Sequence, residues 1–322
     1  MPLVPSDYRP PFPFRNGHFA TIYAGTIRRV RGVAQTRERL ELEDGDFLDL
    51  DWSEAMQPTS KVAIVLHGLE GDAQRHYIVG SAKKLTQNGF DTCAVNLRGC
   101  SGQPNRLYRS YHSGATDDLI SVISHVLNLG KYQEIYLLGY SLGGNLILKY
   151  LGEGNDVPQE VKKAVAVSVP CSLKDACDQL LQSKNALYSA RFKKHLLAKL
   201  REKQRNFQGR ISEESIRNII TLKDFDDAYT APAHGFTDAL DYYAKCSCKQ
   251  FLNKVEVPSL ILNAKDDSFL GEACYPFKEA QENPSLYLEV PNFGGHVGFW
   301  GRKNISYAEE RAVIFFKQTN LP

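Results

Sequence analysis

The sequence predicts an α/β fold in which a mostly parallel sheet carries helices on both faces. Three observations lead to this prediction: short continuous apolar runs rich in Val, Ile, Leu and Ala, helical patterns between those runs, and one long interruption without strand character. Apolar runs without alternation are typical of strands buried on both faces, as in parallel sheets. With 322 residues, the chain is long enough for one large domain with an insertion.

The expected elements follow one another along the chain. The polar, β-like stretch from Thr26 to Asp51 predicts an antiparallel hairpin that turns at residues 43–46. Six apolar runs follow, which make an eight-stranded sheet if the hairpin supplies the first two strands. These runs are Val62–Leu66, Thr92–Asn96, Ile135–Gly139, Lys163–Val169, Ser259–Asn263 and Leu286–Val290. Helical patterns cover Ile78–Gln87, Ala115–Leu129, Leu142–Leu151 and Tyr307–Lys317.

The interval between Val169 and Ser259 has strong helical content, shows no clear strand, and is far longer than an ordinary crossover connection. We therefore expect an inserted helical cap over residues 171–248, with residues 1–170 and 249–322 forming the core. Aromatic residues of this segment (Tyr188, Phe192, Phe207, Tyr229 and Phe236) suggest that it shapes a pocket for an apolar ligand.

One helix of the expected cap is basic and amphipathic. Its apolar residues Tyr188, Phe192, Leu196 and Leu200 recur every four positions. Basic residues occupy the other faces: Arg191, Lys193, Lys194, Lys199, Arg201, Lys203 and Arg205. We interpret this as a helix that packs its apolar stripe on the core and exposes its charges to solvent. Peripheral contact with an anionic membrane surface is the alternative.

Composition excludes several classes of protein. Lys and Arg number 39 against 37 Asp and Glu, so no global positive field attracts nucleic acid. The seven cysteines are odd in number and scattered, as expected for reduced thiols in a cytoplasmic protein, and the Cys246/Cys248 pair lacks the partners of a metal site. We expect no signal peptide and no membrane span, because no apolar run is long enough.

The stretch "LLGYSLGG" contains the candidate nucleophile, Ser141. Glycines stand two residues before and two residues after this serine, between an apolar run and a helical pattern. The G-x-S-x-G arrangement permits a turn so sharp that the serine hydroxyl is exposed at the end of a strand. A strand-to-helix turn that merely relieves crowding is the alternative, and a phosphate-binding loop is excluded because the Gly-Lys-Ser/Thr ending is missing.

A serine nucleophile needs a base and a residue that orients the base. In sheets of this kind the order along the chain is serine, acid, histidine. His296, in "NFGGHVGFW" after the last strand, is the preferred base, and His234, inside the expected cap, is the weaker candidate. His67 precedes the serine and is interpreted as a residue that shapes its loop.

The acid is expected just after the strand at 259–263, because the chemistry of parallel sheets gathers at the carboxyl ends of their strands. "LILNAKDDSFL" places Asp266 and Asp267 there. We prefer Asp267 as the residue that orients His296, with Asp266 as the alternate and Asp175 as a third option.

The negative charge that develops on a substrate oxygen needs hydrogen-bond donors. The backbone N–H groups of Leu142, next to the serine, and of Leu69, in the loop "LHGLEG", are the expected oxyanion hole. Glu70 of that loop is expected to stabilise the loop rather than to transfer protons.

Taken together, these motifs resemble the α/β-hydrolase superfamily, and more narrowly the YheT-like hydrolases, which are related to the eukaryotic ABHD lipases and esterases. The resemblance extends over nearly the whole chain through "NGHFATI", "HGLEG", "NLRGCSG", "GYSLGGN", "DALDYYAKCS", "NAKDDSFL" and "GGHVGF". It implies a Ser-Asp-His triad on Ser141, Asp267 and His296 and hydrolysis of carboxylic esters without a metal or organic cofactor. Where family members commonly carry Pro after the second aspartate, this chain has Ser268.

We therefore expect a serine esterase, of the carboxylesterase or acylglycerol-lipase type, that forms an acyl-enzyme with a small-molecule ester carrying an apolar acyl group. A thioesterase or amidase that uses the same triad is one alternative. A non-catalytic binding protein on the same fold is the other. Dehalogenase or epoxide hydrolase chemistry is disfavoured, because it uses an aspartate in place of Ser141.

Overall fold

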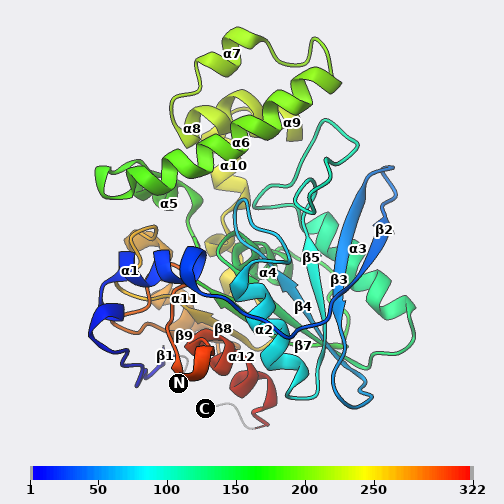
Figure 1. Ribbon diagram of the computed structural model, residues 1–322, viewed down its shortest axis with the longest axis vertical. Helices are drawn as coiled ribbons and strands as arrows, with labels where there is room; N and C mark the ends of the chain where they lie inside the picture. The colour runs from blue at the N-terminus through cyan, green and yellow to red at the C-terminus, as the bar shows by residue number, and fades with distance from the viewer. Residues whose placement is uncertain (1–2, 320–322) are drawn as a thin grey trace.

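The computed structural model describes residues 3–319, which are built around a nine-stranded sheet (Figure 1). The strand order is β1-β9-β8-β7-β6-β4-β5-β3-β2, and all neighbours pair in parallel except β3, which runs antiparallel to β5 and β2. The strands are β1 (Leu3–Val4), β2 (Thr36–Glu41), β3 (Phe47–Ser53), β4 (Lys61–Leu66), β5 (Asp91–Asn96), β6 (Glu134–Tyr140), β7 (Val161–Val167), β8 (Ser259–Leu262) and β9 (Leu286–Glu289). The prediction of a mostly parallel α/β sheet is confirmed.

Helices cover both faces of the sheet, because side chains of a strand alternate between its two faces. In β4, Val62, Ile64 and Leu66 pack into one apolar core with α3 (Thr116–Asn128) and α4 (Leu142–Gly152). Ala63 and Val65 pack into a second core with α2 (His76–Thr86) and α12 (Tyr307–Lys317). Burial on both faces is the physical reason why the strands are continuous apolar runs.

One expectation about the N-terminal part was wrong, and another was confirmed over a shorter range. The sheet has nine strands rather than eight, because the two residues of β1 pair with β9 at the far edge of the sheet. The predicted antiparallel hairpin is confirmed as β2 and β3, but it is shorter than expected: residues 23–27 form a π-helical turn after α1 (Gly17–Ile22), and strand pairing begins only at Thr36. Arg28 leaves this turn toward the interior, where its guanidinium donates to both carboxylate oxygens of Glu309 over 2.6 and 2.8 Å.

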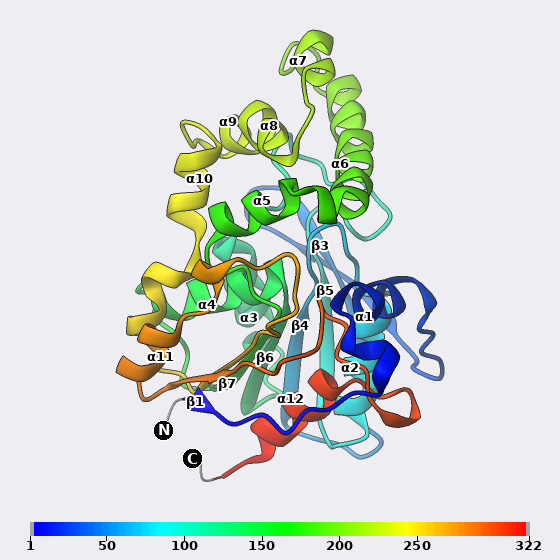
Figure 2. The same ribbon diagram turned by 90° about the vertical axis from the view of Figure 1, so that its left-hand side faces the viewer.

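Between β7 and β8 the chain forms a run of helices above the sheet (Figure 2), which we call the helical insertion (residues 171–248). Its helices are α5 (Leu173–Leu181), α6 (Ala186–Asn206), α7 (Glu213–Arg217), α8 (Leu222–Phe225), α9 (Ala231–His234) and α10 (Ala239–Cys246). After it, α11 (Phe277–Glu282) connects β8 to β9. The division into a core of residues 1–170 and 249–322 and a cap of residues 171–248 stays a prediction.

The long helix α6 does not simply expose its positive charge. Arg191, Lys194, Arg201 and Arg205 are exposed, and Arg191 also lines the cavity beneath the insertion. By contrast, the ammonium groups of Lys199 and Lys203 hydrogen-bond to groups of the sheet-bearing part of the chain. No helix within residues 3–319 is both long enough and apolar enough to cross a membrane.

Candidate active site

Ser141 occupies a strained turn between β6 and α4. Its φ of 52° and ψ of −117° lie outside the regions that non-glycine residues favour, a geometry that costs about 1–3 kcal/mol and must be enforced by the surroundings. The flanking glycines explain how the turn fits. A Cβ atom at Gly143 would lie 2.7 Å from the carbonyl oxygens of Leu66 and His67, and one at Gly139 would collide with the backbone of Gly143.

The structure brings Ser141, His296 and Asp267 together from three loops at the carboxyl ends of strands. His296 Nε2 lies 3.0 Å from Ser141 Oγ, and His296 Nδ1 lies 2.8 Å from Asp267 Oδ2. The Asp267 side chain is fully buried, and the His296 side chain is 8% exposed. Asp267 Oδ1 accepts a hydrogen bond from the N–H of Phe269 over 3.0 Å, which fixes the plane of the carboxylate. This arrangement allows proton transfer from Ser141 to Nε2 while Nδ1–H faces the carboxylate.

The two alternative carboxylates occupy other positions. Asp266 Oδ1 accepts from the N–H of Gly295 over 2.8 Å, and burial, together with the nearby charge of Asp267, raises the pKa of Asp266. Asp175 Oδ2 accepts from the N–H of Ala273 over 2.8 Å. Both carboxylates therefore hold loops around the site, and neither is hydrogen-bonded to His296.

The two alternative histidines also have structural partners. The ring nitrogens of His234 lie 2.7 and 2.9 Å from the carbonyl oxygens of Thr230 and Ser110. Neither nitrogen is hydrogen-bonded to Ser141. His67 is fully buried, and burial lowers its pKa to about 4, so the ring is neutral near pH 7. Its Nδ1–H donates to Gly68 O and its Nε2 accepts from the N–H of Leu97, which fixes the shape of the loop after β4.

The loop after β4 runs directly beside the serine. A Cβ atom placed on Gly68 would lie 3.1 Å from Ser141 Cβ and 3.6 Å from Ser141 Oγ. Leu69 and Leu142, whose backbone N–H groups the sequence suggests as the oxyanion hole, both line the cavity into which Ser141 opens. Their role as donors stays a prediction.

Two residues that the sequence did not indicate also hold His296. The hydroxyl oxygen of Thr21, in α1, accepts a hydrogen bond from the N–H of His296 over 2.8 Å. The Phe269 ring stacks on the imidazole, with ring centroids 4.2 Å apart. Both residues belong to motifs that carry the family resemblance, "NGHFATI" and "NAKDDSFL", but nothing in the local pattern indicates what they contact.

A cavity of about 550 Å³ opens beside Ser141 and extends under the helical insertion. The insertion contributes mostly apolar side chains, among them Leu173, Leu180, Phe192, Leu196, Phe225 and Tyr229. Of the five aromatic residues that the sequence suggested, Tyr188, Phe192 and Tyr229 line the cavity, whereas Phe207 and Phe236 do not. A cavity of this size and polarity fits a small ligand with a large apolar part.

A mostly parallel sheet with a serine on a sharp turn after a central strand is the defining arrangement of α/β hydrolases. Residues 62–303 match the model of the family described as "alpha/beta hydrolase fold", and the chain belongs to this family.

Comparisons with individual proteins agree with this assignment. The chain is 36% identical to "Putative esterase YheT" of Escherichia coli over 302 residues, which cover 92% of this chain and 88% of that protein. It is 27% identical to "Phospholipase ABHD3" of Homo sapiens, over 94% of this chain and 77% of that protein. An esterase of Pyrococcus furiosus, Pf2001, shares the fold with a TM-score of 0.61 and 17% identity, over 90% of this chain and 95% of that one.

Proposed function

We propose that this protein is a serine hydrolase that cleaves carboxylic esters through Ser141, His296 and Asp267. The observation that carries the proposal is the continuous hydrogen-bonded line from Ser141 Oγ through the His296 ring to Asp267, with distances of 3.0 and 2.8 Å, at the wall of an apolar cavity. Relatives whose names denote esterase and phospholipase activity support ester bonds as the target.

In the proposed reaction, Ser141 Oγ attacks the ester carbonyl carbon while His296 Nε2 takes the serine proton. The carbonyl oxygen becomes an oxyanion that accepts hydrogen bonds from the N–H groups of Leu69 and Leu142. The tetrahedral intermediate then collapses, and the leaving alcohol takes the proton from His296. Water repeats the sequence on the acyl-enzyme and releases the carboxylic acid, while Asp267 holds the imidazole and stabilises its positive charge.

The substrate is proposed to be a small-molecule ester whose apolar acyl group occupies the cavity under the helical insertion. The lining by Leu173, Phe192 and Phe225 favours hydrocarbon over charged groups. Thioesters and amides are alternative substrates, because their carbonyl groups could be attacked by Ser141 in the same way. Peripheral contact with anionic lipid through the exposed basic side of α6 also stays a prediction.

Labelling with a fluorophosphonate tests the nucleophile, because this reagent phosphonylates an activated serine. We expect intact mass to increase by one adduct, peptide mapping to place that adduct on Ser141, and Ser141→Ala to remain unlabelled. Unlabelled wild-type protein with native circular dichroism would contradict the proposal.

A panel of p-nitrophenyl esters from acetate to palmitate, extended to matched thioesters and anilides, tests the substrate class. We expect the esters to be preferred and kcat/KM to rise with acyl length until the cavity is filled. A preference for thioesters would indicate that the protein is a thioesterase. If the Ser141→Ala variant hydrolyses the esters as fast as the wild type, the proposed mechanism is excluded.

A further inference from the structure

A lysine of the helical insertion reaches the loop that contains a proposed oxyanion donor. Lys199 Nζ, from α6, donates to Glu70 Oε1 over 2.9 Å, and the side chains of Lys199 and Glu70 are 37% and 5% exposed. Glu70 directly follows Leu69. The ion pair therefore links the insertion to the residue next to the proposed donor.

Glu70 is held tightly on its other side as well. Its backbone has a φ of 54°, in the left-handed region that side chains other than glycine disfavour. Its N–H donates to the hydroxyl of Tyr111 over 2.8 Å, and that hydroxyl donates to Glu70 Oε1 over 2.8 Å. The carboxylate of Glu70 thus stabilises its own strained backbone through Tyr111, and Lys199 supplies the charge that keeps the carboxylate in place.

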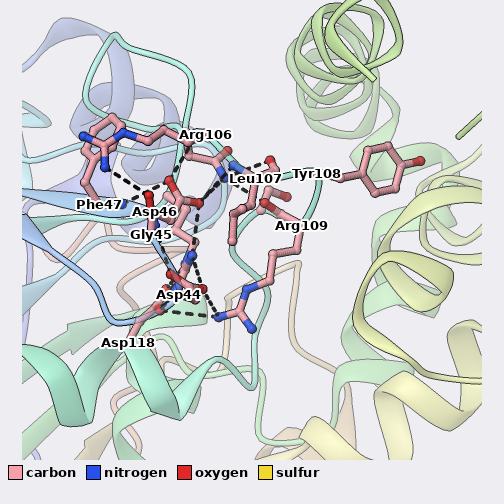
Figure 3. Close-up of polar contacts among 12 residues, drawn as sticks. Asp44, Gly45, Asp46, Phe47, Arg106, Leu107, Tyr108, Arg109 and Asp118 are labelled. Carbon is pink, nitrogen blue, oxygen red and sulfur yellow. Dashed lines mark hydrogen bonds and ion pairs between the residues drawn. The ribbon is translucent and has the colours of Figure 1, made fainter. Parts of the chain in front are cut away.

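The loop that carries Tyr111 is anchored to the hairpin of β2 and β3 (Figure 3). The carboxylate of Asp46 accepts from the N–H groups of Arg106 and Leu107 over 2.8 and 3.4 Å. Arg109 lies 3.5 Å from Asp44 and 3.8 Å from Asp118. The insertion also contacts this loop, for example through the Tyr229 hydroxyl, which donates to Tyr108 O over 2.6 Å. Lys199 is the residue of the insertion that hydrogen-bonds to the Glu70 carboxylate itself.

The charges of this group are well defined near neutral pH. Burial disfavours the ammonium of Lys199, but the Glu70 carboxylate 2.9 Å away opposes that effect, and the pKa of Lys199 is raised. Burial raises the pKa of Cys100 to about 11, so its sulfur, 3.3 Å from Lys199 Nζ, remains a thiol. The ion-pair partner of Lys199 in this group is therefore Glu70.

We infer that Lys199 is a positioning residue for the proposed ester hydrolysis: through Glu70 and Tyr111 it holds the Leu69 N–H where the oxyanion forms. This inference rests on the proposed function. If the inference holds, both oxyanion donors are in position only when the helical insertion packs against the sheet-bearing part of the chain. A shift of α6 would break the ion pair between Lys199 and Glu70. The Leu69 N–H would then no longer be held in position, and it would stabilise the oxyanion much less.

The chain offers a matched control one helical turn further along α6. Lys203 also reaches across from the insertion, donating to Asn105 O over 3.1 Å and to Asn105 Oδ1 over 2.7 Å. It holds the same helix to residues 105–107 and does not hydrogen-bond to the loop of residues 67–71. Arg201, exposed between the two lysines, controls for loss of surface charge.

The experiment compares Lys199→Met, Lys203→Met and Arg201→Ala with the wild type in ester turnover and in hydrogen–deuterium exchange of residues 67–73. For Lys199→Met we expect kcat to fall about tenfold or more while KM changes less than about threefold, since the group acts on the transition state. We also expect faster exchange of residues 67–73. The two controls should keep kcat within about threefold of the wild type, with unchanged exchange in this loop.

Several results would overturn the inference. Equal kcat losses in Lys199→Met and Lys203→Met would indicate that the lysines only seat the insertion. A change confined to KM would indicate direct contact of Lys199 with substrate. Loss of turnover without faster exchange of residues 67–73 would exclude positioning of this loop.

If Lys199→Met fails to fold, Glu70→Gln replaces it, since it keeps the shape of the side chain and removes the charge. Where both single variants fold, the double variant Lys199→Met/Glu70→Gln gives a further check, because residues that act through one contact should together lose no more than the worse single variant. A wild type without esterase activity would refute the proposed function, while the exchange comparison would still decide whether Lys199 orders the loop.

Discussion

The Thr21 hydroxyl connects helix α1 to the backbone of His296. It donates to Gly17 O over 2.7 Å within the helix and accepts the N–H of His296 over 2.8 Å. The two residues are separated by most of the chain, and the side of α1 that faces His296 is packed so closely that a Cβ atom at Gly295 would lie 2.7 Å from Thr21 Oγ1. The N-terminal helix is therefore part of the support of the proposed base.

Thr21→Val should remove this support while preserving the shape of the side chain. The N–H of His296 would lose its partner, which costs about 1–2 kcal/mol in a buried setting, so we expect kcat to fall roughly tenfold. Steady-state hydrolysis of a p-nitrophenyl ester measures the effect. Thr26→Val is the control, because Thr26 is exposed and its hydroxyl donates to Ile22 O, the one hydrogen-bond partner of that hydroxyl among residues 3–319. Equal rates for both variants and the wild type would contradict the prediction.

Replacing the two adjacent aspartates separates their roles. Asp267→Asn should leave the imidazole in the wrong tautomer and reduce kcat by about 10³- to 10⁴-fold with the fold intact. Asp266→Asn should reduce kcat far less, since the Asn oxygen can still accept from the N–H of Gly295. Both are measured as kcat at constant pH, with circular dichroism as the test of folding. A larger loss for Asp266→Asn would reverse the assignment of the acid.

Gly143→Ala tests the tightness of the turn that carries Ser141. A methyl group there would lie 2.7 Å from Leu66 O and His67 O, which are backbone atoms of a central strand and its loop. We expect the free energy of unfolding to fall by about 2 kcal/mol or more, as for overpacked interiors. Urea denaturation measures it. Gly25→Ala, where a Cβ atom would meet nothing within 4 Å, should be close to neutral.

The sequence was sufficient for the central sheet because each central strand is buried on both faces. Val62–Leu66 and Ile135–Gly139 were predicted as continuous apolar runs, and they lie within β4 and β6. The strand β1 escaped prediction because Leu3 and Val4 are too few residues to show a pattern. Its pairing depends on an edge that β9 provides from the other end of the chain.

The sequence predicted the proposed catalytic residues, because local motifs mark them. It did not predict the residues that hold them in place, because these are far away in the sequence. Glycine spacing pointed to Ser141, and chain order pointed to His296 and Asp267, which the structure places in hydrogen-bonding contact. The partners Lys199 and Glu70 are 129 positions apart in the sequence. The helical periodicity indicated only that Lys199 lies outside the apolar stripe of its helix. A lysine at such a position is usually exposed to solvent, so its contact with Glu70 could not be predicted.

Asp226 should make stability depend on pH. It lines the cavity inside the helical insertion, accepts from the hydroxyls of Thr230 and Tyr243 over 2.6 Å each, and forms no ion pair within residues 3–319. Burial raises the pKa of Asp226 to about 6, above the value of about 3.9 for an unfolded aspartate. Its contribution to stability is therefore fully present below about pH 4 and is lost as the pH rises through about 6.

Asp226→Asn removes the ionisation, so the variant should gain stability relative to the wild type as the pH rises. We expect the difference in free energy of unfolding to grow by about 2 kcal/mol between pH 4 and pH 7. Urea denaturation at several pH values in this interval measures it. The exposed Asp178, which pairs with Lys174 on the surface, provides the control variant Asp178→Asn, which should show no such growth. A difference that stays constant with pH would show that Asp226 ionises equally in the folded and unfolded chain.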